Sequence, residues 1–122
     1  MSETDDPLDR QQLESLVDEI GDRDLVRDAV QAFLDEAPDR LAAIRVALAG
    51  RDRDELRSAA HSLGSPASML GAVEVTRLAR TLQDAARESD AATCRTVAED
   101  LEASTRRTVA AMHAYLVDAE PS

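Results

Sequence analysis

His61 is the residue whose type and surroundings in this sequence best suit chemistry. It lies in the segment AAHSLGSPASMLGA, residues 59–72, among small residues. An imidazole has an unperturbed pKa of about 6.5, so a large neutral, nucleophilic fraction is present at cellular pH. Arg57, one helical turn earlier, places a positive charge where an anion can be held. The segment therefore suggests a nucleophile that is open to a large, anion-bearing partner.

The accessibility of His61 depends on its position around the helix that this segment predicts. A helix turns about 100° per residue, and one apolar face is formed by Leu56, Ala60, Leu63, Ala67 and Leu70. His61 lies about 140° from Leu56, on the opposite side. That side also carries Asp54, Arg57, Ser65 and Ser68, with Gly64 at its edge. We therefore expect His61 to be exposed in the middle of its helix.

Gly64 and Pro66 are unusual residues for the interior of an exposed helix. Glycine there costs about 1 kcal/mol relative to alanine, and proline costs more unless the helix bends. Two explanations are open: the small residues leave room for a partner around His61, or they allow another helix to pack closely. The exposed histidine and nearby Arg57 favour the first explanation.

Two other residues of chemically active types have simpler interpretations. His113 is predicted to point outward between Val109 and Leu116, without a run of small residues, and we interpret it as a surface residue. Cys94 lies at the flank of an apolar stripe and is expected to pack there.

The elements that must position His61 are predicted to be five helices. Apolar residues recur at helical spacing in a short segment that ends at Gly21, and in longer segments over about residues 23–49, 53–70, 73–88 and from 91 onward. Short connections require successive helices to run antiparallel. The expected fold is all-α: an antiparallel up-down four-helix bundle with an additional short N-terminal helix. We expect the bundle over residues 8–118, with flexible tails at 1–7 and 119–122.

Polar and small residues indicate where these helices begin and end. Asp6 followed by Pro7 is typical of a helix start, and Gly21 of a helix end. Asp22, Asp52 and Asp90 are the expected N-caps of later helices, and Gly50 and Gly71 the expected stops. Pro38 predicts a kink in the second helix, with a clean break as the alternative.

The composition excludes several classes of protein. The 122 residues carry a net charge of −11, and all 14 basic residues are arginine, so binding to nucleic acid is disfavoured. No stretch approaches the roughly 20 apolar residues of a membrane span, and the acidic N-terminus does not resemble a signal peptide. Cys94 is the single cysteine, which is typical of a reducing compartment. We therefore expect a cytoplasmic protein with no membrane contact.

The sequence resembles the histidine-containing phosphotransfer (HPt) domains of two-component phosphorelays. That family carries His-x-Leu-Lys-Gly, with a further glycine ten residues after the histidine. His61, Leu63 and Gly71 match, as does the lead-in Ala59-Ala60. The likeness extends to "FLDEAPDRLAAIRVALAGRDRDELRSAAHSLG" and "GAVEVTRLARTLQDAARESD", and covers roughly residues 8–117. Two positions depart from the motif: Gly64 stands where the family has lysine, and Ser65 where it has glycine.

The resemblance implies a phosphorelay intermediate. His61 would accept a phosphoryl group from a receiver-domain aspartate and pass it to another receiver, beside Arg57, Gly64, Ser65 and Ser68. The sequence has no nucleotide-binding loop and no metal-ligand cluster, so the chain is expected to be a phosphocarrier and not an enzyme. It would have no cofactor of its own, because the receiver supplies Mg²⁺. The expected partners are response-regulator receivers and a hybrid sensor kinase, met by a monomer.

Two alternatives remain open at the level of the sequence. A degenerate HPt-like bundle would bind receivers or kinases without carrying phosphate, and the missing lysine at Gly64 favours that reading. A homodimerising helical scaffold would require an exposed apolar patch, for example on the first helix.

Overall fold

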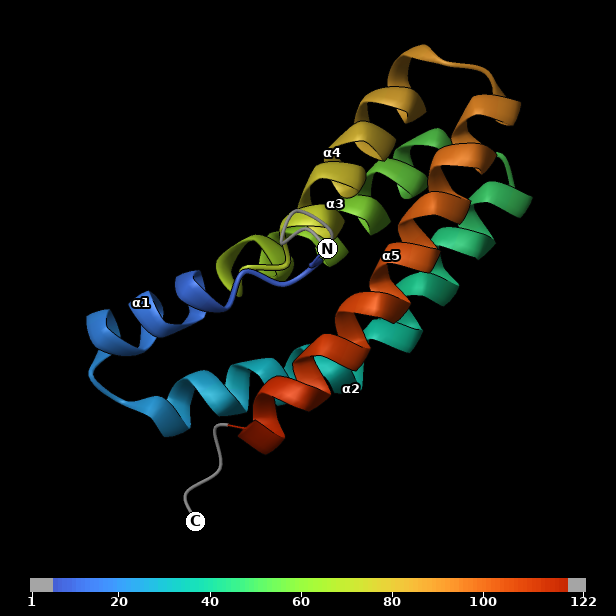
Figure 1. Ribbon diagram of the computed structural model, residues 1–122. Helices are drawn as coiled ribbons and strands as arrows, with labels where there is room; N and C mark the ends of the chain where they lie inside the picture. The colour runs from blue at the N-terminus through green and yellow to red at the C-terminus, as the bar shows by residue number, and fades with distance from the viewer. Residues whose placement is uncertain (1–5, 119–122) are drawn as a thin grey trace.

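The computed structural model describes residues 6–118, which fold into helices joined by short turns (Figure 1). The five helices are α1 (Arg10–Ile20), α2 (Arg23–Ala49), α3 (Arg53–Met69), α4 (Val73–Glu88) and α5 (Ala91–Asp118). The all-α expectation, with a short helix before four longer ones, is confirmed. The expected tail residues 1–5 and 119–122 lie outside the described part of the chain.

The four longer helices form a closed ring of neighbours. α2 packs on α3, α3 on α4, α4 on α5, and α5 returns to α2, while α1 packs on α2. Figure 1 shows α2 and α5 running the length of the molecule, with the α3–α4 hairpin beside one half and α1 beside the other. Turns of two or three residues reverse the chain after α2, α3 and α4, which makes sequential helices antiparallel. Within residues 6–118, no helix is long and apolar enough to cross a membrane.

Carboxylate caps begin most of the helices as the sequence predicts. Asp22 accepts from Asp24 and Leu25, Asp52 accepts from the Glu55 amide at 3.0 Å, and Asp90 accepts from the Thr93 amide at 2.8 Å. Each cap satisfies an amide that has no partner inside its own helix.

The predicted start of the first helix is wrong by one turn. Asp9, not Asp6, is the N-cap of α1, and its side chain accepts from the Gln12 amide at 3.1 Å. Asp6 accepts from the Leu8 amide at 3.0 Å and so forms a turn before the helix. Leu8 is 2% exposed, because this turn inserts it into the core. Burial of Leu8 thus delays the helix start beyond the proline.

Pro38 does not break α2, which is helical from Arg23 to Ala49. The alternative of a clean break is therefore wrong. Proline has no N–H, so the Leu34 carbonyl loses its usual helical partner at this point. Ala37 and Leu41 are buried on either side of the proline, so packing against the rest of the bundle holds the helix together.

Gly71 joins α1 to the α3–α4 turn. Its φ of +78° lies in the left-handed region, as expected of a helix stop. Its carbonyl accepts from the Asp9 amide at 2.8 Å. A Cβ atom at this position would lie 2.7 Å from the Asp9 carbonyl oxygen, so only glycine allows this approach. The glycine ten residues after His61 is thereby explained as a docking point for α1.

Candidate functional site

His61 is exposed on α3, as predicted, at the edge of a shallow depression between α3 and α4. The depression has a volume of about 220 Å³. It is lined by His61, Gly64, Ser65 and Ser68 from α3 and by Thr76, Ala79, Arg80 and Gln83 from α4. The structure therefore brings together four of the five residues that the sequence placed around the site, and adds a second wall from α4.

Gly64 has a structural explanation that differs from the one first favoured. The residue is buried, and a Cβ atom built on it would lie 2.8 Å from the Ala79 Cβ of α4. Its missing side chain therefore allows α3 and α4 to approach each other closely, which is the second of the two explanations left open above. Ser65 and Ser68 are exposed beside His61. Their side chains are small and polar, so they leave the imidazole accessible to a partner.

Arg57 does not line the depression with His61. Its guanidinium lies 3.7 Å from the Asp54 carboxylate on the preceding turn, and the Asp54 side chain is 95% exposed. Such a solvent-exposed pair contributes little to stability, but it partly neutralises the arginine. Arg57 lies one helical turn before His61, as the sequence predicts. Its charge is partly neutralised by Asp54.

Arg80 is the residue that reasoning from the sequence missed. It is exposed on α4, lines the depression with His61, and forms no ion pair with any residue in the range 6–118. Thr76, Arg80 and Gln83 recur at spacings of four and three, so they share one face of the helix. That spacing was a visible signal, but only the packing of α4 on α3 shows that this face borders His61.

A second depression of about 420 Å³ continues from the first along α4. Ser68, Thr76 and Arg80 line both, and Gln12 and Arg77 line the second. The Gln12 side-chain amide donates to the Ser68 carbonyl at 2.8 Å, which brings α1 to the rim of the site. The His61 face is therefore framed by three helices and carries two arginines within a strongly acidic protein.

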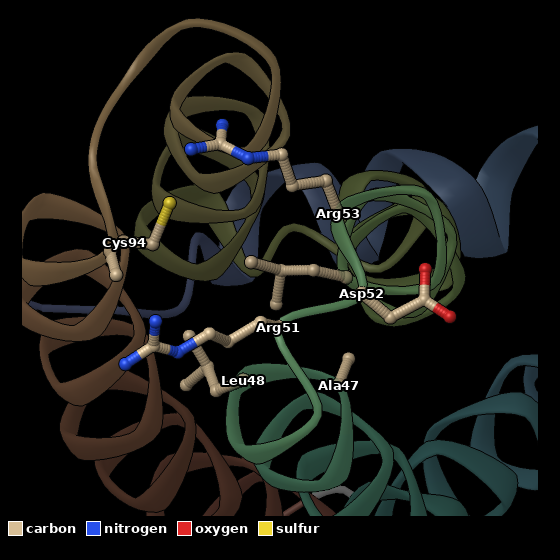
Figure 2. Close-up of a pocket in the computed structure, with 8 residues that line it drawn as sticks. Ala47, Leu48, Arg51, Asp52, Arg53 and Cys94 are labelled. Carbon is tan, nitrogen blue, oxygen red and sulfur yellow. The ribbon is translucent and has the colours of Figure 1, made fainter.

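An apolar pocket at the N-terminal end of α3 offers no comparable chemistry (Figure 2). Its buried Cys94 donates its thiol to the Ala85 carbonyl at 3.3 Å, and Arg53 donates to the Ala86 carbonyl at 2.9 Å. Both polar groups are thus used in joining helices, which agrees with the packing role expected for Cys94. His113 is exposed on α5, as predicted, and does not line the His61 depression.

Comparisons with known proteins agree with this architecture. The family model described as "Hpt domain" matches residues 28–114, well over half of the chain. The crystal structure of histidine-containing phosphotransfer protein B (HptB) from Pseudomonas aeruginosa PAO1 is similar in fold, with a TM-score of 0.83 and 23% sequence identity. The similarity covers 93% of this chain and 97% of that one. The search of curated proteins finds no match. Members of the matched family are, in general, phosphocarriers of two-component systems, and this chain belongs to the Hpt domain family.

Proposed function

We propose that the protein is a phosphorelay intermediate in which His61 accepts a phosphoryl group from a receiver aspartate and later passes it to another receiver. The observation that carries this proposal is an exposed imidazole in the middle of α3, within a bundle of the Hpt family. The imidazole shares a shallow depression with Arg80, which has no ion-pair partner among residues 6–118. A histidine that served only the fold would not require that open setting.

The chemistry asked of His61 is a simple displacement. The lone pair of a neutral imidazole nitrogen attacks phosphorus, the P–O bond to the receiver's aspartate breaks, and its electron pair leaves with the carboxylate. The proton on the other ring nitrogen stays there, so the phosphorylated ring is positively charged and the phosphoryl group can leave again. Phosphoryl transfer requires mainly positioning and charge stabilisation. The receiver brings Mg²⁺ in its own acidic pocket, and this chain brings the nucleophile.

The surface around His61 supports docking of a second domain. Ser65 and Ser68 leave the ring open, and two exposed apolar residues, Met69 and Val73, stand at the neighbouring α3–α4 turn at 61% and 46% exposure. The Gln12 contact to Ser68 places α1 beside them. We propose that a receiver contacts this face, with α1 at its border. Val46 on α2 is a further exposed apolar residue, at 70% exposure.

A second candidate function is favoured by one observation. Gly64 replaces the lysine that the resemblance leads us to expect, so the bundle would bind receiver or kinase domains without carrying phosphate. The two functions share the docking face and differ only in whether His61 forms a bond to phosphorus.

The test is phosphoryl transfer from a phosphorylated receiver domain to this protein, beside His61→Gln and the matched control His113→Gln. We expect acid-labile, alkali-stable label on the wild type and on H113Q, and none on H61Q. Binding to several receivers without any transfer would contradict the carrier proposal and support the interaction module. Light scattering on the same samples tests the proposed monomer; a stable dimer would instead support the scaffold alternative.

A further inference from the structure

The missing lysine at position 64 has a steric cause. The Cβ atom that any lysine would require lies 2.8 Å from the Cβ of Ala79. Both atoms are fixed directly to helix backbones, so the contact can be relieved only by moving α4 away from α3. Position 64 therefore cannot supply a cation to His61 while the two helices keep this spacing.

The same close approach brings a different cation to the histidine. Arg80 follows Ala79 directly, and it lines the depression that His61 borders. Of the 14 arginines in the chain, eight form ion pairs within residues 6–118, and two more, Arg27 and Arg53, donate to backbone carbonyls. Arg80 does neither, although the chain has 25 acidic residues to pair with. Its guanidinium is therefore available to an incoming anion.

Asp84, an acidic residue on the same face of α4, does not form an ion pair with Arg80. Asp84 lies one turn after Arg80 and lines the adjoining depression with it. Its carboxylate instead lies 3.6 Å from the guanidinium of Arg87. Arg77, one turn before Arg80, lines only the adjoining depression, and it too forms no ion pair within residues 6–118.

We propose that Arg80 binds the phosphoryl group carried by His61 and so takes the place of the absent lysine. This inference rests on the proposed function. The planar guanidinium presents parallel N–H donors that match two phosphoryl oxygens, and its charge opposes the charge on those oxygens during transfer. The residue holds the group while the N–P bond forms and the P–O bond to the receiver breaks; it takes no proton. Arg80 is thus a phosphoryl-binding residue on α4, whereas the lysine of the motif would have been on α3.

The experiment compares Arg80→Ala with Arg77→Ala, its matched control on the same helix, and with Arg80→Lys. Each variant is phosphorylated by a receiver domain and, separately, by phosphoramidate, and its thermal unfolding is recorded to show that the bundle is intact. We expect R80A to slow transfer about 10- to 100-fold, the range of one charged hydrogen bond. R77A should remain within about threefold of the wild type, and R80K should recover part of the loss because it restores the charge.

A second readout separates binding of the phosphoryl group from a merely structural effect. The phosphorus NMR signal of phosphorylated His61 should titrate at lower pH in the wild type than in R80A, because a nearby cation favours the more highly charged phosphoryl form. Equal rates and equal titrations in R80A and R77A would overturn the assignment of Arg80 and leave the proposed function intact. A wild type that takes no label from either donor would overturn both.

Discussion

His61 and His113 are both exposed histidines on long helices, but only His61 lines one of the depressions described above. α4 brings Arg80, Thr76 and Gln83 to His61 across a shallow depression. His113 lies on α5 beside Met112, which is buried in the core, and Ala114, which is exposed. Residue type and exposure are the same in the two cases. The contact between α3 and α4, and not the histidine alone, therefore makes the depression at His61.

The largest expected effect concerns Gly71, which ties α1 to the His61 side of the bundle. Gly71→Ala combines a left-handed backbone with a Cβ 2.7 Å from the Asp9 carbonyl oxygen. We expect it to lower the free energy of unfolding by about 2–4 kcal/mol, measured in urea. Gly21→Ala is the matched control: its φ is +79°, but nothing lies within 4 Å of its Cβ, so only the cost of about 1–2 kcal/mol for the backbone is expected. Equal losses in the two variants would contradict the close approach at Gly71.

The next effect tests the contact that builds the site. Gly64→Lys should lower the free energy of unfolding by about 1–3 kcal/mol, because α4 must move to accept the new Cβ. The control is Ala110→Lys, at an exposed position one turn from His113, with an expected change within about 0.5 kcal/mol. The lysine at position 64 should also fail to restore transfer to R80A. A stable Gly64→Lys variant that restores transfer would mean that the two helices are not held this closely.

A smaller effect concerns Tyr115 on α5, the only tyrosine of the chain. Burial and the neighbouring Glu14 carboxylate raise the pKa of Tyr115 above its ordinary value of 10.0, and its hydroxyl donates to Glu14 at 3.2 Å. The absorbance of the phenolate should therefore appear at higher pH in the folded protein than in urea. Since the folded pKa is raised, this contribution to stability is complete below the unfolded pKa and is lost as the pH rises through the folded one.

The variant Glu14→Gln tests the cause of that shift. It should lower the pKa of Tyr115 only part of the way, because burial is the larger cause and remains. Phosphorylation of His61 should leave this titration unchanged. A Tyr115 pKa that is the same in Glu14→Gln and in the wild type would show that Glu14 of α1 does not contact Tyr115 of α5.

The smallest effect is expected at Arg57. Arg57→Ala should change the rate of transfer less than about threefold, because its charge is shared with Asp54 and the residue does not line the depression. Single-turnover transfer from a phosphorylated receiver measures this beside R80A. If R57A lowers the rate of transfer more than R80A does, Arg57 of α3, and not Arg80 of α4, binds the phosphoryl group.

The fold was largely readable from the sequence, because apolar spacing and aspartate caps act locally. Helical periodicity around His61 placed the ring on the exposed side correctly. Asp6 and Pro7 are a local signal that predicts an earlier start for α1, whereas the burial of Leu8, which moves the start to Asp9, is a tertiary effect. The unbroken helix at Pro38 likewise reflects packing on both sides of the proline.

Only the α3 residues of the site could be predicted from the sequence, for a physical reason. A helical wheel gives the direction of Gly64 but not which helix occupies that direction, so its burial against Ala79 was not foreseen. Arg80 is separated from His61 by 18 residues and a turn, and the register between α3 and α4 decides whether the two meet. The sequence therefore predicts the site residues on α3, but it does not predict which residues of α4 face them.

The most direct test observes both histidines in one sample of the unaltered protein. Long-range proton–nitrogen NMR distinguishes the two imidazole rings, and it is recorded before and after reaction with a phosphorylated receiver domain. We expect the His61 ring nitrogens to shift and couple to phosphorus at one phosphoryl group per chain, while the His113 ring is unchanged. Phosphorylation of His113, or of both rings to the same extent, would contradict the claim that the α3–α4 contact makes the site.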